Sequence, residues 1–173
     1  DCGFGLAEAT AATVSPSTPP TGLPSLVPSS APTGGYPAER FALAKLYDFA
    51  GGKGWFTKTN WMDPTKHVSE WYGVYTGSGE SWGDGTPGAV TILRLDSNHL
   101  NHVLPSELGL LDNLLRFDVR ANSLHSSLPT ELGSLTNAAA LYLQSNNFNS
   151  SLPSEIGHLR NLGVLDISNN SLS

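Results

Sequence analysis

Apolar and polar residues alternate in four short stretches that recur every 24 residues from Val90 to the end of the chain. Each stretch holds two large apolar residues separated by one position, as with Leu93 and Leu95. The equivalent pairs are Phe117 and Val119, Leu141 and Leu143, and Leu165 and Ile167. Alternation of this kind points both apolar side chains to one face of a β-strand. The pattern therefore predicts one short strand in each repeat, with the four strands stacked in parallel.

An asparagine stands three residues after the second apolar residue of every repeat. These asparagines are Asn98, Asn122, Asn146 and Asn170. An amide side chain has two donor hydrogens and an acceptor oxygen, so it can satisfy buried main-chain groups of its own coil and of the neighbouring coil. We therefore predict a structural asparagine ladder at the turns that follow the strands.

The second half of each complete repeat also keeps a fixed pattern. A Leu-Pro pair, at Leu104-Pro105 in the first repeat, is followed by Ser-Glu or Thr-Glu and then by an apolar residue and glycine. Proline cannot donate a hydrogen bond to a strand, and it is suitable for starting a helical turn. Each coil is thus predicted to contain a strand, a turn, a short helical turn and a glycine exit.

The full repeat, L-x-x-L-x-L-x-x-N-x-L-x-x-x-L-P-x-E-L-G-x-L-x-N, resembles the plant-type leucine-rich repeats over residues 90–173. That class occurs in receptor-like kinase ectodomains, polygalacturonase-inhibitor-like proteins, and algal and bacterial proteins. The resemblance implies an α/β solenoid, a right-handed superhelix with short parallel strands on its concave face. Family units usually carry glycine where this chain has His102, Ser126 and Ser150. The second strand or its turn is therefore expected to differ from the plant proteins.

Residues 37–89 precede the repeats and are predicted to cap the first coil, whose apolar end would otherwise be exposed. Apolar residues at helical spacing, which are Phe41, Leu43, Leu46, Tyr47 and Ala50, predict a helix that ends at Gly51-Gly52. The tryptophans that follow it predict an aromatic cluster. The motifs A-L-x-x-L-Y and W-Y-G-V resemble the amino-terminal cap of the same repeat family. Cys2 is the only cysteine, so no disulfide within the chain can stabilise this cap.

Residues 1–36 are predicted to form a disordered tether rich in Pro, Ser and Thr. Residues 9–38 contain no charged residue and too little apolar bulk to fold. The composition suits a sugar-bearing stalk and a plain linker equally well. No stretch is long and apolar enough for a membrane span. We expect the sequence to be part of a longer protein with further repeats or a cap beyond Ser173.

The outward residues of the strands are the candidate ligand-binding face. They include Arg94, Asp96, Arg116, Asp118, Arg120, Tyr142, Gln144 and Asp166. One interpretation is structural, with lateral salt bridges from Arg94 to Asp118 and from Asp96 to Arg120 across neighbouring strands. The other is functional, because arginine and tyrosine are favoured at the energetic centres of interfaces.

Other candidate sites carry weaker signals. His99, His102 and His125 lie on turns of adjacent coils, but no carboxylate or cysteine occupies a matching position, so we predict neither a metal nor a cofactor. Asn149 and Asn169 begin glycosylation sequons. The net charge of −6 disfavours nucleic acid and anionic membrane surfaces as partners.

These features together predict a recognition module for a protein or peptide ligand, not an enzyme. The resemblance to receptor-like kinases implies the extracellular part of a signalling receptor, anchored to the membrane by segments outside this sequence. The alternative is a stand-alone secreted binder or inhibitor that resembles polygalacturonase inhibitors.

Overall fold

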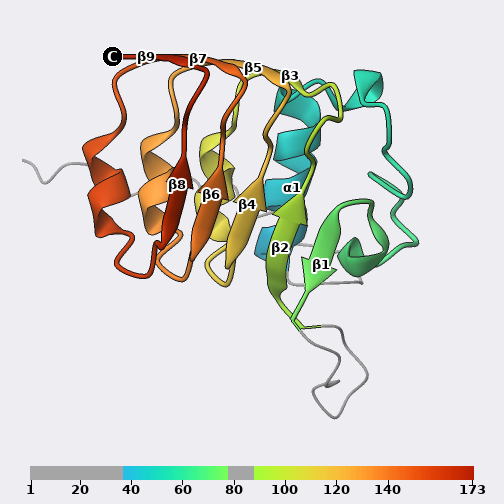
Figure 1. Cartoon of the computed structure of the whole chain (residues 1–173). Helices are drawn as coiled ribbons and strands as arrows, with labels where there is room; N and C mark the ends of the chain where they lie inside the picture. Colours follow the sequence, from blue (N-terminus) through green and yellow to red (C-terminus); the bar gives the residue numbers. More distant parts are fainter. Residues whose placement is uncertain (1–36, 78–87) are drawn as a thin grey trace, which may run out of the picture. The chain divides into compact units, whose positions relative to one another are not determined.

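The computed structural model describes residues 37–77 and 88–173. The predicted tether, residues 1–36, and residues 78–87 of the predicted cap lie outside the described residues. In the part that is described, each 24-residue repeat forms one coil, and a helix with several loops precedes the first coil (Figure 1). None of the described helices has the length and apolar character that crossing a membrane requires.

The first sheet contains one strand from each coil and one strand from the cap. In spatial order its strands are β1 (Val74–Thr76), β2 (Val90–Arg94), β4 (Arg116–Asp118), β6 (Ala140–Tyr142) and β8 (Val164–Asp166). The four strands from the coils are parallel and place equivalent residues side by side, as with Leu93 and Phe117. Both of these side chains are fully buried. The predicted parallel strand of each repeat is therefore confirmed.

A second, smaller sheet follows the asparagine turns along one edge of the coils (Figure 1). It consists of β3 (Asn101–His102), β5 (Ser123–Ser126), β7 (Asn147–Ser150) and β9 (Ser171–Leu172). His102, Ser126 and Ser150, which stand where family members carry glycine, adopt φ angles of 71°, 75° and 78°. These residues thus take up the left-handed conformation that glycine adopts most easily, and the second strand is present in each coil.

The return segment of each complete coil is a 3-10 helix. These helices are η3 (Ser106–Leu110), η4 (Thr130–Ser134) and η5 (Ser154–His158). Each is preceded by a proline, as predicted. The glycine, however, is not the exit from the helical turn but lies within it, as Gly133 does in η4. A Cβ atom on Gly133 would lie 2.6 Å from the Cβ atom of Glu155 in the next coil, so glycine is needed here for close packing of the coils.

The core runs through all the coils along their inward side chains. Leu93, Phe117 and Leu141 are fully buried at equivalent positions of the first three coils. Their counterpart in the fourth coil, Leu165, is only half-buried, because no described coil packs on that side. Each coil therefore depends on the next one to bury its apolar side chains.

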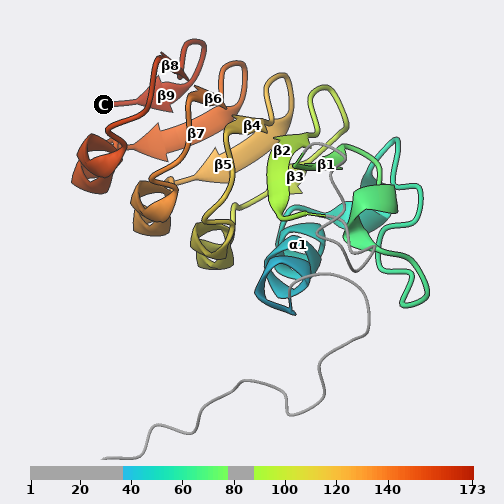
Figure 2. The same cartoon turned by 90° about the horizontal axis from the view of Figure 1, so that it is seen from below.

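The cap contains α1 (Pro37–Phe49) and the 3-10 helices η1 (Gly52–Gly54) and η2 (Val68–Glu70). Viewed along the strands, α1 stands in line with η3, η4 and η5 (Figure 2), so it occupies the place of a return helix before the first coil. Its inner face buries Leu43 and Leu46 as predicted, and Ala50, in the turn just after the helix, is also buried. Phe41 departs from the prediction, since 41% of its surface is exposed.

The predicted aromatic cluster forms the centre of the cap. Trp61 lies between Trp55 and Trp71, with ring centroids 4.8 Å and 5.0 Å away. Tyr47 from α1 packs against Trp55 at 5.3 Å, which joins the helix to the cluster. Strand β1 then leaves the cap and pairs antiparallel with β2, so it covers the free edge of the first repeat strand.

A buried carboxylate connects α1 to the first repeat. Glu39, of which 4% is exposed, accepts a hydrogen bond at 2.9 Å from the backbone N–H of Val90. Burial raises the pKa of Glu39 above its ordinary value of 4.5. The hydrogen bond from the Val90 N–H lowers this pKa in part, and the negative charge of Asp112 raises it further. A raised pKa in the folded state means that ionised Glu39 disfavours folding.

Replacing Glu39 with glutamine is therefore expected to stabilise the protein at neutral pH. The amide oxygen can still accept from Val90, but no charge is buried. The folding stability that protonated wild-type Glu39 contributes is fully present below its ordinary pKa, and it is lost as the pH rises through the raised pKa of the folded state. The advantage of E39Q in urea unfolding should thus be clear at about pH 7 and shrink towards about pH 4. The exposed carboxylate of Glu131 provides the control, because E131Q should show no such trend. An equal advantage of E39Q at both pH values would contradict the proposed charge effect.

Candidate functional site

The outward residues of the first sheet form three parallel rows, which we call the sheet face. Register places Tyr75, Ile92, Arg116, Ala140 and Val164 in the first row. The second row contains Arg94, Asp118, Tyr142 and Asp166. The parallel pairing continues beyond the strands and gives a third row with Asp96, Arg120, Gln144 and Ser168. The structure thus brings all eight candidate residues onto one surface.

A cluster of two arginines, an aspartate and a tyrosine lies at the centre of the sheet face. Asp118 is fully buried and accepts a hydrogen bond at 2.8 Å from Arg116. The Nε atom of Arg120 lies 3.7 Å from the other oxygen of Asp118. Both guanidinium groups also approach the ring of Tyr142, at 4.6 Å and 5.8 Å from its centroid. One buried negative charge thus holds two partly exposed positive charges against an aromatic ring.

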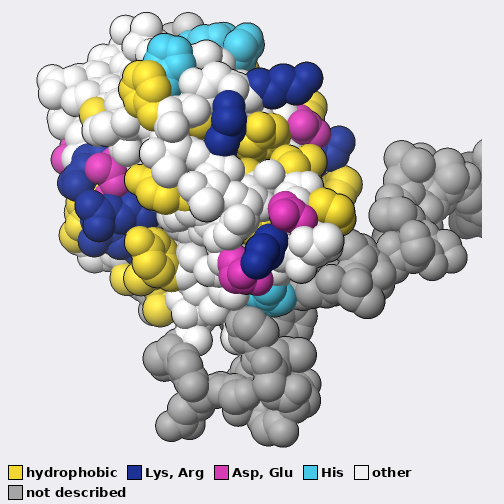
Figure 3. Space-filling view, turned by 90° about the vertical axis from the view of Figure 1, so that its right-hand side faces the viewer, with side chains coloured by type: hydrophobic (Ala, Val, Ile, Leu, Met, Phe, Trp, Pro, Cys, Tyr) yellow, Lys and Arg dark blue, Asp and Glu magenta, His cyan; other side chains and the backbone are white. Residues whose placement is uncertain are grey.

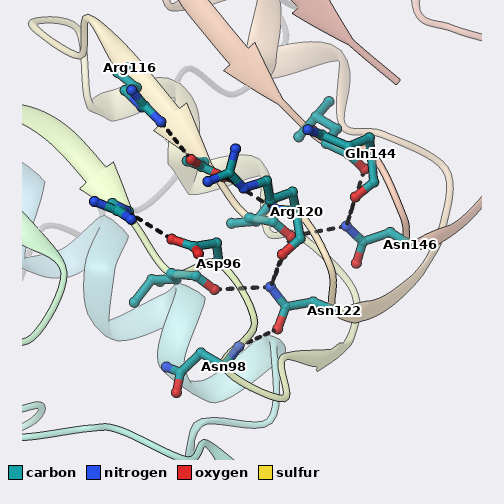
Figure 4. A network of polar contacts seen from close by, with 12 residues as sticks. Asp96, Asn98, Arg116, Arg120, Asn122, Gln144 and Asn146 are labelled. Carbon is teal, nitrogen blue, oxygen red and sulfur yellow. Dashed lines mark hydrogen bonds and ion pairs between the residues drawn. The ribbon is translucent and has the colours of Figure 1, made fainter. Parts of the chain in front are cut away.

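The predicted lateral salt bridges are not formed. Arg94 pairs at 2.9 Å with Asp96 of its own chain segment (Figure 4), and not with Asp118 of the neighbouring strand. Asp118 is instead engaged by Arg116 and Arg120 from its own strand and the turn after it. Residues two apart on a strand point to the same side, so a long arginine side chain reaches its neighbour along the strand. The Asp96 carboxylate raises the pKa of Arg94.

The remaining polar residues of the sheet face lie beside this cluster. Asp166 accepts hydrogen bonds from the hydroxyl and the backbone N–H of Ser168, and the hydroxyl is the main reason that the pKa of Asp166 is lowered. Asp166 is therefore ionised at neutral pH. Two buried polar atoms in the described residues of this face have no hydrogen-bond partner, namely Nε of Arg116 and Oε1 of Gln144.

The asparagines form the predicted ladder next to the sheet face (Figure 4). The oxygen of Asn122 accepts from the backbone N–H groups of Asn98 and Leu100 in the preceding coil. Its amide nitrogen donates to the carbonyl of Leu95 in that coil and to the carbonyl of Val119 in its own. Asn146 and Asn170 repeat the two donor bonds one and two coils later, and each accepts from one backbone N–H of the preceding coil, that of Leu124 and that of Phe148.

The first rung of the ladder connects the repeats to the cap. Asn98 has no preceding coil, and it pairs instead with Thr57, accepting from its backbone N–H at 2.7 Å and donating to its carbonyl at 2.8 Å. The ladder thus fixes the spacing of the coils and of the cap, and with it the spacing of the side chains on the sheet face.

Comparison with known proteins identifies the repeat. A family model described as Leucine Rich Repeat matches residues 139–159, which include β6, β7 and η5. The leucine-rich-repeat ectodomain of the receptor kinase SOBIR1 from Arabidopsis thaliana shares 22% identity, with a TM-score of 0.64 over 80% of this chain and 70% of its own. The fold of this chain is that of a leucine-rich-repeat solenoid.

Two further solved structures share the leucine-rich-repeat fold. The PEPR1–AtPEP1 complex shows 21% identity and a TM-score of 0.63 over 78% of this chain. The Arabidopsis receptor kinase HAESA, solved with the peptide hormone IDA and the co-receptor SERK1, shows 26% identity and a TM-score of 0.60 over 78%. The present chain spans 18% of the PEPR1 chain and 21% of the HAESA chain. No curated protein sequence matches it.

The leucine-rich-repeat solenoid carries one feature of its sheet face that the sequence did not reveal. Tyr75 from β1 lies beside Ile92, and 51% of its surface is exposed. It extends the first row of the face into the cap and adds an aromatic side chain there. Strand β1 has only three residues, which is too short for alternation to give a reliable signal.

The three candidate histidines separate into two groups. His102 and His125 lie together on β3 and β5, with ring centroids 6.0 Å apart. His99 packs on Phe56 instead, at 5.0 Å. In the described parts of the chain, no three His, Cys, Asp or Glu side chains come together at one point suited to a metal.

The two glycosylation candidates lie on the surface near the second sheet. Asn149 is exposed on β7. Asn169 is exposed at the asparagine turn, where its φ angle is 54°. Both side chains are therefore accessible to a modifying enzyme.

Proposed function

We propose that this leucine-rich-repeat chain is a recognition module that binds a protein or peptide through its sheet face. The cluster of Arg116, Asp118, Arg120 and Tyr142 is the observation that carries this proposal. Its guanidinium groups are already oriented by Asp118 and by the tyrosine ring before a ligand arrives. Groups held in this way lose little conformational entropy on binding.

The chemistry of the cluster favours an acidic group on the ligand. Asp118 is buried and neutralises one of the two arginine charges, so the exposed surface of the cluster remains positive. An arginine binds a carboxylate through paired N–H donors, and the side chains of Arg116 and Arg120 are both partly exposed. The rest of the first row, with Tyr75, Ile92 and Val164, provides apolar contact around it. We infer a partner with an acidic residue next to apolar ones.

The setting that we propose is the extracellular part of a receptor-like signalling protein. It is supported by the likeness in fold to SOBIR1 and by the HAESA structure, in which a receptor kinase is seen with a peptide hormone. Glycosylation of Asn149 and Asn169 would agree with this location. In the same proposal, membrane anchoring comes from segments outside this sequence, and the module itself binds its ligand without catalysis.

Substitution of Tyr142 by alanine tests the sheet face. A peptide library rich in acidic residues would be screened against the full chain, and the affinity of selected peptides measured by biolayer interferometry. Because Tyr142 contacts both arginines, Y142A should weaken binding about tenfold, the effect of losing a contact worth roughly 1–2 kcal/mol. The fold should persist, since Tyr142 is only half-buried.

The control removes an arginine from the other side of the solenoid. Arg160 is exposed just after η5, and R160A should leave the affinity of the same peptides unchanged. A loss for R160A as large as that for Y142A would show that binding is not confined to the sheet face. Peptides that bind equally well to Y142A and to the unaltered protein would place recognition elsewhere and overturn the proposal.

A further inference from the structure

A pair of histidines stands apart from the sheet face, on the second sheet. His102 lies on β3 and His125 on β5, and both side chains are exposed. Figure 3 shows histidine side chains gathered at the top of the view, at the edge where the coils turn. The two rings are 6.0 Å apart between centroids and inclined by 47°. Neither residue takes part in the ligand-binding cluster proposed above.

The ring of His102 is oriented by contacts that begin in the cap. Asn101 donates its backbone N–H to the carbonyl of Ala50 at 3.0 Å. Its side chain packs against Gly51, where a Cβ atom would collide with it. The oxygen of that side chain forms a hydrogen bond with Nδ1 of His102. Since an amide oxygen can only accept, Nδ1 is the donor of this bond, which leaves Nε2 as the ring nitrogen that can face a metal ion.

The separation of the rings suits two ligands of one metal ion. A zinc–imidazole bond measures about 2.0–2.1 Å, and the ring centre lies about 1 Å beyond the nitrogen, so each centroid is about 3.2 Å from the ion. Two such rings are about 5 Å apart at a tetrahedral angle and about 6.5 Å apart when opposite each other. The 6.0 Å between His102 and His125 falls within this range.

We propose that His102 and His125 bind a divalent transition-metal ion through two imidazole nitrogens. Both residues sit on strands anchored by backbone hydrogen bonds between coils, including that from Ser123 to Leu100, so the backbone that carries the two rings is held in place before the ion arrives. No third histidine, cysteine or carboxylate joins them among the described residues. The remaining positions of the ion are therefore filled by water. The site goes beyond the sequence-based expectation, which assigned no metal to this chain.

The nature of the ligands indicates which ions are preferred. Imidazole nitrogen suits Zn(II), Ni(II) and Cu(II), whereas Mg(II) and Ca(II) prefer oxygen. For nitrogen ligands, affinity rises from Mn(II) through Ni(II) to Cu(II) and is lower again for Zn(II). We expect this order of affinity and no binding of Mg(II).

Isothermal titration of the full chain with Zn(II) and with Cu(II) tests the site. Cys2 is replaced by serine in every variant, so that its thiol does not bind the metal. H102Q and H125Q should each weaken binding at least about tenfold, because either change leaves a single imidazole. Asn101→Ala should weaken it by a smaller factor, of about tenfold at most, because the ring of His102 would no longer be oriented.

Two other exposed histidines provide matched controls, His158 on η5 and His99 beside Phe56. H158Q and H99Q should bind the metals as the parent does. If H99Q or H158Q weakened binding as much as H125Q, attraction to scattered histidines would explain the result and the paired site would be wrong. Lack of saturable binding by the parent would also overturn it. Unfolding curves without metal will show that each variant is folded.

Discussion

Replacing Gly133 with alanine is expected to lower the free energy of unfolding by about 2–3 kcal/mol. Gly133 is buried within η4, and its neighbour across the coil boundary is the backbone of Glu155. An added Cβ atom would lie 2.6 Å from the Cβ atom and 2.7 Å from the carbonyl carbon of Glu155. Backbone atoms cannot turn aside as a flexible side chain would. The two coils would have to separate, and leucines between them would lose packing.

The repeat supplies its own controls for this substitution. Gly157 is the equivalent residue of the next coil, and a Cβ atom there would meet nothing within 4 Å. G157A should be neutral or stabilise by up to about 1 kcal/mol, since alanine favours helical backbone over glycine. Gly109 is intermediate, with the carbonyl oxygen of Glu131 at 2.9 Å. Urea unfolding followed by tryptophan fluorescence should rank the losses as G133A, G109A and then G157A. Equal effects at all three positions would refute the packing explanation.

The period of the sequence made the framework of the fold predictable. The inward pairs such as Leu93 and Leu95, and the asparagines, recur every 24 residues, so a single structural solution has to satisfy every copy at once. The structure shows both features, with the strands in register and the asparagine amides bonded between coils. The candidate residues of the sheet face follow from the same alternation, because an outward position on one strand implies outward positions on the others.

Details that are not repeated were harder to predict. Arginine side chains have several rotatable bonds, so residue spacing could not decide whether Asp118 pairs across the strands or along them. Strand β1 lies in the cap, where no second copy reveals its alternation. At Ser126 and Ser150, the fold imposes a left-handed backbone that the residue type alone does not favour. In the three cases, contacts distant in the sequence decide among local conformations that the sequence leaves open.

The proposed metal site shows the same limit of sequence-based prediction for a functional feature. His102 and His125 do not occupy equivalent positions of their repeats, and they meet because the second sheet pairs His102 with Leu124. That stagger brings different positions of neighbouring coils together. Spacing in the sequence suggested that these histidines are near each other, but only the structure shows which two of the three pair, through the register of the second sheet.

The substitution with the largest expected effect is Asn122→Ala, which should lower the free energy of unfolding by about 3–5 kcal/mol. Asn122 accepts hydrogen bonds from two N–H groups, at 3.0 Å and 2.9 Å, and donates at 2.9 Å to each of two carbonyls. Alanine would leave the N–H groups of Asn98 and Leu100 and the carbonyl of Leu95 without these partners between two packed coils, whereas the carbonyl of Val119 keeps the bond from Asn146. A buried polar group without a hydrogen bond costs about 1–3 kcal/mol, and partial entry of water would reduce the total.

An asparagine outside the ladder separates this effect from the loss of any amide. Asn137 also donates from its side chain to a carbonyl of the preceding coil, that of Asp112, at 2.8 Å, but both groups are exposed. N137A should therefore cost less than about 1 kcal/mol, because water replaces the lost partner. Chemical unfolding of both variants provides the comparison. If N122A were no more destabilising than N137A, the ladder would contribute little to holding the coils together. If N122A is severely destabilising and N137A is not, the asparagine recurs in every repeat because main-chain groups buried at the coil boundary need its amide. The spacing of the rows on the sheet face then also depends on this residue.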